Sequence, residues 1–298
     1  MRVTDNMLQS VFLNNLKNVK SQMGETQEKL ATGKNINRPS DDPLGTARLL
    51  RLNNEIENIK TYGNSVDEGM AFVSTTTSSL EGIQQEATRL ITYMTSARDA
   101  TKDPKDFAAK VETSIDNLLA YANTKYGGKY IFGGTDHSEK PYGMDSTNTY
   151  VEEKTSHLDG AQKIRISSSA TLQVNIPGRD VFGTVGNPPG TDIFNSLIDL
   201  KNRLAAGETP TNSDIEMLNN FNDNVLSELT VAGNLYNRLS DAKSLLETQR
   251  QDVETLMGKV QEVDVARAIV DLKDLQTTMD RTLQISSYVL PKSLLDYL

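Results

Sequence analysis

The stretch INRPSDDPLG, residues 36–45, decides how this chain folds, because it separates two long amphipathic helical patterns. Pro39 and Pro43 each disfavour the helical conformation at the residue before them, so a helix is not expected to continue through the stretch. Asp42 is predicted to cap the next helix, with Pro43 in its first turn. Asp41 adds a negative charge near the positive end of that helix. The predicted corner motif consists of Asn37, Arg38, Pro39, Ser40, Asp41, Asp42 and Pro43.

Chemical alternatives for the corner are weaker. Adjacent carboxylates can bind a hard cation, but the calcium-loop pattern of alternating acids, a central glycine and a distal glutamate is missing. The two histidines, His137 and His157, do not have the spacing of a zinc motif, and the chain has no cysteine for thiolate chemistry. We therefore predict no catalytic, cofactor-binding or metal-binding residue, and we do not expect an enzyme.

Upstream of the corner, residues 8–30 show a helical pattern with one narrow apolar stripe. From Phe12 onward the steps alternate between four and three residues, with Thr26 at one position, and this heptad spacing lets a seam meet a partner helix. Gly33 is the expected end of the helix. The residues predicted to form the assembly seam on this side are Phe12, Leu16, Val19, Met23 and Leu30.

A second stripe with the same alternation runs from Val265 to Leu283, with Gln276 at one seam position. Neither helix can bury its stripe alone, and helical stability in water comes mostly from the packing of the apolar face. The two chain ends are therefore predicted to pair. The residues predicted to form the seam on this side are Ile269, Leu272, Leu275, Met279 and Leu283, of which Leu275 widens the stripe.

Between the ends, residues 43–100 and 103–126 continue as helical patterns, with soft interruptions expected at Gly63 and Gly69. The segment GGKYIFGGTDHSEKPYGM and the short alternating runs after it indicate half-buried antiparallel strands. Helical spacing then returns. The predicted fold is mainly α: an elongated helical rod with paired N- and C-terminal coiled-coil helices and a small antiparallel β insertion at the far end.

This organisation predicts three layers. The terminal coiled-coil layer comes from both chain ends, a helical rod follows, and a small β domain is inserted into the rod. The predicted boundaries are 1–33 and 262–298 for the terminal layer, 34–125 and 191–261 for the rod, and 126–190 for the β domain.

The charge of the chain argues against two classes of partner. Among 298 residues, 40 are acidic and 31 basic, which gives a formal net charge of −9. Such a chain repels the phosphates of nucleic acid and anionic lipid. The chain contains no run of about 18 apolar residues, which is the length needed to span a bilayer. Its N-terminus also lacks the unbroken apolar stretch of a secretory signal. We expect neither nucleic-acid binding nor membrane insertion, and we expect any export to use another route.

The stretch LATGKNINRPSDDPLGTARLLRL, residues 30–52, resembles the N-terminal motif of the flagellin superfamily, in which a long terminal helix runs into an Asn/Arg, Ser, Asp-Asp corner. Three features resemble the hook-filament junction family within it: the prolines of RPSDDP, the segment KYIFGGTD at 129–136 and the ending SLLDYL at 293–298. Flagellins proper more often carry alanine at Pro43 and Leu44. The resemblance covers roughly the first and last hundred residues, and the middle only through YIFGGT.

The resemblance implies an extracellular structural protein of bacterial motility, exported through the flagellar type III channel without a cleaved signal peptide. Its implied partners are copies of itself in a ring, the first hook-filament junction protein (hook-associated protein 1), flagellin, and a cytoplasmic export chaperone that binds the C-terminal segment. It implies no cofactor, and it implies that the terminal helices become ordered on assembly. Pro291 departs from the family pattern and is predicted to turn the last residues off the helix axis.

Other functions stay open at this point. Flagellin itself, present along the whole filament, has the same stripes and corner. An intracellular helical scaffold has similar stripes but does not explain the corner and the ending, and a receptor rod needs membrane spans. An enzyme carried in the insertion is disfavoured, because no zinc-protease motif occurs between residues 126 and 190.

Overall fold

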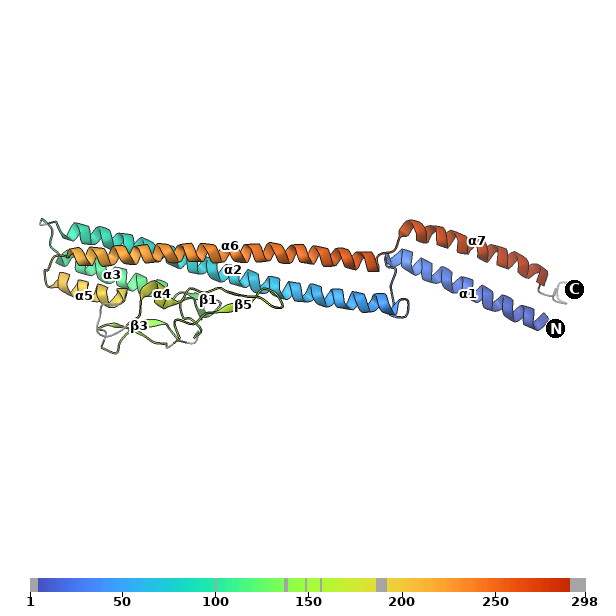
Figure 1. The fold of residues 1–298 in the computed structure, drawn as a ribbon, viewed down its shortest axis with the longest axis horizontal. Coiled ribbons are helices and arrows are strands. Elements are labelled where there is room, and N and C mark those ends of the chain that lie inside the picture. The colour runs from blue at the N-terminus through green and yellow to red at the C-terminus, as the bar shows by residue number, and fades with distance from the viewer. Residues whose placement is uncertain are drawn as a thin grey trace. The chain divides into compact units, whose positions relative to one another are not determined.

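The computed structural model describes residues 5–99, 101–136, 139–147, 149–155, 157–185 and 192–289 (Figure 1). The predictions that concern His137, Pro291 and the ending at 293–298 lie outside these residues. The chain divides into two compact units, which we call the terminal unit, residues 1–58 with 249–298, and the central unit, residues 59–248. The finer division into three layers stays a prediction.

The terminal unit contains both chain-end helices. Helix α1 (Asp5–Thr32) and helix α7 (Val265–Val289) pack side by side and run in opposite directions (Figure 1). The first turns of α2 (Pro43–Ala97) and the last turns of α6 (Asn212–Gln261) belong to the same unit. The predicted pairing of the N- and C-terminal helices is confirmed.

Helix α1 ends where the sequence predicts. Gly33 has a φ of 70°, a left-handed conformation that a residue with a side chain rarely adopts, and it stops the helix. The backbone N–H of Lys34 then donates to the Thr32 hydroxyl at 3.2 Å. The next helix begins at Pro43, where the missing N–H of proline leaves no helical hydrogen bond unmade.

The helices of the central unit differ from the prediction in one respect. Helix α2 is continuous through Gly63 and Gly69, so the interruptions expected there are absent. A Cβ on Gly69 would lie 2.8 Å from Ile164 Cδ1, so the missing side chain lets the β segment approach the helix. Helix α3 (Lys105–Ala122) packs against α5 (Ile193–Ala205).

Within its described residues, the β segment contains three separate two-stranded antiparallel sheets. Gly127 and Gly128, with φ of 56° and 83°, form the two-residue turn of the first hairpin, and positive φ at both positions is typical of a turn that matches the twist of the strands. The small antiparallel insertion expected from the sequence is confirmed. The strand pairs are β1 (Lys125–Tyr126) with β2 (Lys129–Tyr130), β3 (Tyr142–Met144) with β4 (Val151–Glu153), and β5 (Lys163–Arg165) with β6 (Thr171–Gln173).

An aromatic cluster joins the β segment to the helices of the central unit. The buried rings of Phe132, Tyr142, Phe182 and Phe194 contact one another with centroid distances of 5.1–5.5 Å. Phe182 closes the short helix α4 (Gly178–Phe182), and Phe194 lies in the first turn of α5. Such edge and stacked contacts add about 0.5–1.5 kcal/mol per pair to the burial of the rings. This aromatic cluster therefore anchors the insertion to the helices of the central unit.

We expect the central unit to depend on its buried α2 stripe. Leu90 is fully buried, and Leu90→Ala should lower the free energy of unfolding by about 2–5 kcal/mol, because it leaves a cavity in a packed interior. Leu245→Ala, at a side chain that is 59% exposed, should change it by less than about 0.5 kcal/mol. Urea denaturation followed by circular dichroism measures both, and equal effects would contradict this assignment of the core.

Candidate functional site: the terminal helix pair and its corner

Asp41 closes the turn of the corner through its side-chain carboxylate. Its Oδ2 atom accepts hydrogen bonds from the backbone N–H groups of Asn37 at 3.1 Å and Arg38 at 2.8 Å. The hydrogen bond from Arg38, more than that from Asn37, lowers the pKa of the Asp41 carboxyl below its ordinary value of 3.8. The sequence assigned Asp41 to the positive end of the next helix, but the carboxylate instead closes the turn that precedes the helix.

Asp42 caps helix α2, as predicted. Its Oδ1 atom accepts a hydrogen bond from the backbone N–H of Gly45 at 2.9 Å, which satisfies one of the unpaired donors of the first turn. A Cβ on Gly45 would lie 2.5 Å from Ile36 Cδ1, and Ile36 is only 7% exposed. The corner thus closes over one buried isoleucine, which needs a glycine opposite it.

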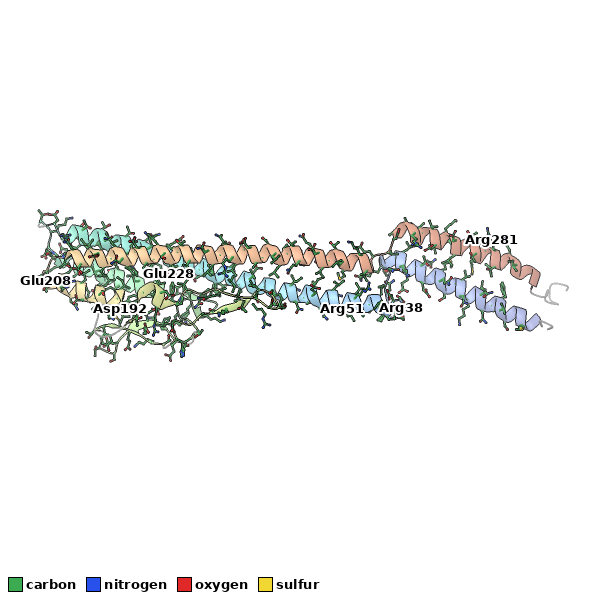
Figure 2. All side chains as sticks on the ribbon, in the orientation of Figure 1. Arg38, Arg51, Asp192, Glu208, Glu228 and Arg281 are labelled. Carbon is green, nitrogen blue, oxygen red and sulfur yellow. The ribbon has the colours of Figure 1, made fainter. Side chains whose placement is uncertain are left out.

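An ion pair ties the corner to α1. Arg38, labelled in Figure 2, places its Nη2 atom 3.2 Å from both carboxylate oxygens of Glu28. Both side chains are well exposed, so the pair stabilises the corner by at most about 1 kcal/mol. The Lys29 ammonium donates to Asn35 Oδ1 at 3.0 Å. Two side chains of the last turns of α1 therefore hold the start of the corner.

Two backbone hydrogen bonds join the corner to the link between α6 and α7. The N–H of Asn35 donates to the carbonyl of Gln261 at 2.7 Å, and the N–H of Val263 donates to the carbonyl of Gly33 at 3.1 Å. Asp264 then caps α7 by accepting a hydrogen bond from the N–H of Arg267 at 3.0 Å. We call these two backbone hydrogen bonds the backbone clip. It couples the two connections that lead into the terminal helices.

The remaining corner residues are exposed, apart from Asn37. Pro39, Ser40 and Pro43 are exposed, and Asn37 is half-buried, with its Nδ2 atom donating to the carbonyl of Lys34 at 3.3 Å. Their contribution is conformational, because the prolines fix φ and exclude helix between α1 and α2.

The predicted seam residues do not all lie between α1 and α7. On α1, the half-buried seam residues are Phe12, Leu16, Val19, Met23 and Leu30. On α7, Leu272, Leu275 and Met279 are also half-buried, whereas Ile269 is 54% exposed and Leu283 is 46% exposed. The last two therefore lie on the outer flank of the pair.

The α7 face turned to α1 is rotated by one position from the predicted stripe. Ala268 is 6% exposed and Thr282 is half-buried, and both are seven residues from Leu275. The heptad signal was present, but a small and a polar side chain at two of its three positions hid it, while the larger Ile269 and Leu283 marked the neighbouring row.

The helix pair leaves much apolar surface accessible. Val265 is 52% exposed, in line with Ile269 and Leu283 on the outer flank of α7, and Leu13 on α1 is 58% exposed. Two helices cannot surround their own seam, and apolar surface of this kind indicates an interaction site when it is contiguous. This arrangement can bind further helices.

The part of the chain that the structure describes contains no group of three or more His, Asp or Glu side chains that could hold a metal ion. None of the described helices is long and apolar enough to cross a membrane.

The chain is similar in sequence to known proteins of the bacterial flagellum. Residues 3–137 match the bacterial flagellin N-terminal helical region. Flagellar hook-associated protein 3 of Escherichia coli (strain K12) is 23% identical to this chain over 322 residues, which cover 99% of this chain and 94% of that protein. The chain is similar to bacterial flagellin in its N-terminal helical region and to a hook-associated protein 3 over nearly its whole length. Flagellin of Bacillus subtilis (strain 168) is 22% identical to this chain over 283 residues, which cover 90% of this chain and 89% of that protein.

A solved structure has a similar fold. Flagellar hook-associated protein 3 from Legionella pneumophila superimposes with a TM-score of 0.61 at 15% identity, and the match covers 70% of this chain and 98% of that one. At this identity the likeness concerns the fold alone.

The hydrogen bonds to Asp41 predict how the corner responds to acid. Because the folded-state pKa lies below 3.8, the stabilisation by Asp41 is complete above that pH and is lost as the pH falls through the folded-state pKa. The amide proton of Arg38 should therefore titrate in NMR spectra with a midpoint below 3.8, and Asp41→Asn should abolish that titration. A midpoint at or above 3.8 would contradict the assigned hydrogen bonds.

Proposed function

We propose that this chain is a structural subunit of the bacterial flagellum that joins the hook to the filament by polymerising through its terminal helices. The observation that carries the proposal is the accessible seam of the α1–α7 pair in a chain that aligns over 99% of its length with a hook-associated protein 3. The same alignment supports a place outside the cell, in the flagellum.

Burial of the seam residues supplies the binding energy in this proposal. Complete burial of a leucine or isoleucine side chain stabilises by about 1.5–3 kcal/mol, so a side chain such as Ile269, at 54% exposure, gains roughly half of that on assembly. Ordering of the chain ends opposes this gain. Several seam residues from neighbouring copies must therefore be buried together, which makes assembly cooperative.

The proposed neighbours follow from this position. Copies of the chain form a ring in the flagellar axis, with hook-associated protein 1 on one side and flagellin on the other. Before export, a cytoplasmic chaperone covers the C-terminal segment. The exposed outer flank of α7 supports this step, because an uncovered apolar flank invites association inside the cell.

Flagellin is the second candidate, and one observation favours it. The Bacillus subtilis flagellin aligns over 89% of its own length, so a short flagellin has almost the same extent as this chain. Both candidates use the same seam. They differ in where the subunit is placed along the flagellum.

Immunogold electron microscopy decides between the two. An antibody against residues 126–190, applied to intact flagella with the hook attached, should give one spot or band where the hook meets the filament. Label along the whole filament would make the chain a flagellin. Absence of label from flagella would contradict a flagellar role and favour a cytoplasmic scaffold.

A double substitution tests the seam. Leu16→Asp with Met279→Asp should leave the central unit folded by circular dichroism but reduce incorporation into flagella at least about a hundredfold, because two charges are buried on assembly without partners. The matched control is Asn18→Asp with Thr277→Asp, which adds the same charge at exposed positions and should incorporate normally. Normal incorporation of the seam variant would refute the proposed role of the terminal helices.

A further inference from the structure

The first turns of α2 carry a charged face without a partner. Arg48, Arg51 and Glu55 are spaced three and four residues apart, so they lie on one side of the helix, and all three are exposed. None of them forms an ion pair with another residue that the structure describes. Leu44, at 65% exposure, begins the same face. Arg51 is labelled in Figure 2.

Helix α7 carries a second unpartnered face with the opposite signs. Arg267, Asp271 and Asp274 are spaced four and three residues apart, are exposed, and form no ion pair within the described ranges. The two aspartates line an open groove of about 390 Å³ between α7 and α1, with Glu25 on the opposite wall. Lys29 also lines the groove, but its ammonium donates to Asn35 Oδ1.

The charges on the two faces are opposite in sign and equal in spacing when one of the helices is read in reverse. Read forward, α2 presents plus, plus and minus at steps of three and four. Read backward from Asp274, α7 presents minus, minus and plus at the same steps. A rise of about 1.5 Å per residue gives the charges equal separations on both helices.

We propose that the Leu44–Glu55 face of α2 in one copy docks antiparallel along the α7 groove of a second copy. Arg48 then lies opposite Asp274, Arg51 opposite Asp271, and Glu55 opposite Arg267. This contact rests on the self-assembly proposed above and names the surfaces that meet. The ion pairs determine which surface is bound and in what alignment, while the apolar seam supplies most of the affinity.

A second copy fits these surfaces better than other occupants. Within one chain the two faces belong to the same terminal unit, yet the structure forms no ion pair between them. A nucleic acid or an anionic lipid surface calls for charge of one sign, whereas each face here carries both signs. A complementary face of equal spacing is present in every other copy.

Charge reversal tests the docking in a flagellated strain that lacks its own copy of this chain. Arg48→Asp with Arg51→Asp should lower incorporation at the hook-filament junction at least about tenfold, because like charges then face each other. Asp271→Arg with Asp274→Arg should do the same. The chain that carries all four substitutions should regain most of the wild-type incorporation.

A pair of opposite polarity excludes an effect of net charge. Glu55→Arg and Arg267→Glu should each impair incorporation, and the two together should restore it. Lys273→Asp, at an exposed α7 residue outside the groove lining, is the control and should incorporate normally. Circular dichroism of each variant checks that it folds.

Cross-linking gives a direct readout, because the chain contains no cysteine. Copies with Arg51→Cys and copies with Asp271→Cys, expressed together, should give a cross-linked dimer when isolated flagella are treated with a short bismaleimide. Arg51→Cys with Lys273→Cys should give little. A longer reagent than a disulfide is needed, since an arginine-aspartate pair holds its Cβ atoms further apart than a disulfide allows.

The outcomes separate this inference from the function on which it rests. Impaired reversal variants that are not rescued in combination, or reversal variants that all incorporate normally while Leu16→Asp with Met279→Asp does not, would overturn the docking and leave the junction role standing. Failure of the wild-type chain to enter flagella would overturn both. Rescue together with the specific cross-link would establish the contact.

Discussion

The structure depends on a simple limit of helix geometry: two helices cannot surround the seam between them. Helices α1 and α7 meet along a heptad seam, and its large side chains stay half-buried while Ile269 and Leu283 remain exposed on the outer flank. In the central unit, by contrast, residues such as Leu90 are fully buried. The terminal pair is therefore the part of the chain whose stability is incomplete without neighbours. A subunit that must form a layer with its copies requires such a pair.

The corner fixes the conformation of the chain where it enters and leaves the α1–α7 pair. Asp41 closes the turn, Asp42 caps α2, and the backbone clip bonds residues 33–35 to residues 261–263. Each contact is individually modest. Because the clip links the connection before α2 to the one after α6, α1 and α7 are held at their bases by the same hydrogen bonds. The two helices thus begin their seam in a fixed alignment, close to the buried side chains of Ile36 and Ala268.

The features that were predicted correctly depend on local residue chemistry and on periodicity. The end of α1 at Gly33, the cap at Asp42, the pairing of the terminal helices and the small antiparallel insertion all follow from residue type and spacing. Three features did not follow. The rotation of the α7 face rests on Ala268, whose small side chain carries little hydrophobic signal. The backbone clip uses main-chain atoms, which leave no trace in residue identity. Helix α2 continues through Gly69 although glycine is a weak helix former, and the missing side chain there leaves room for Ile164.

A heptad seam by itself leaves one ambiguity, which the charged faces address. The steps of four and three repeat every seven residues, so a neighbour shifted by one heptad meets nearly the same apolar surface. Burial therefore stabilises several alignments almost equally. The pattern Arg48, Arg51, Glu55 and its reversed counterpart on α7 has no such repeat, because a shift of seven residues places Arg267 or Arg281 where Asp274 stood. Exposed ion pairs add little to affinity, but they distinguish between alignments that are otherwise equal. Apolar burial and charge thus perform separate tasks in this subunit, the first holding copies together and the second determining where they meet.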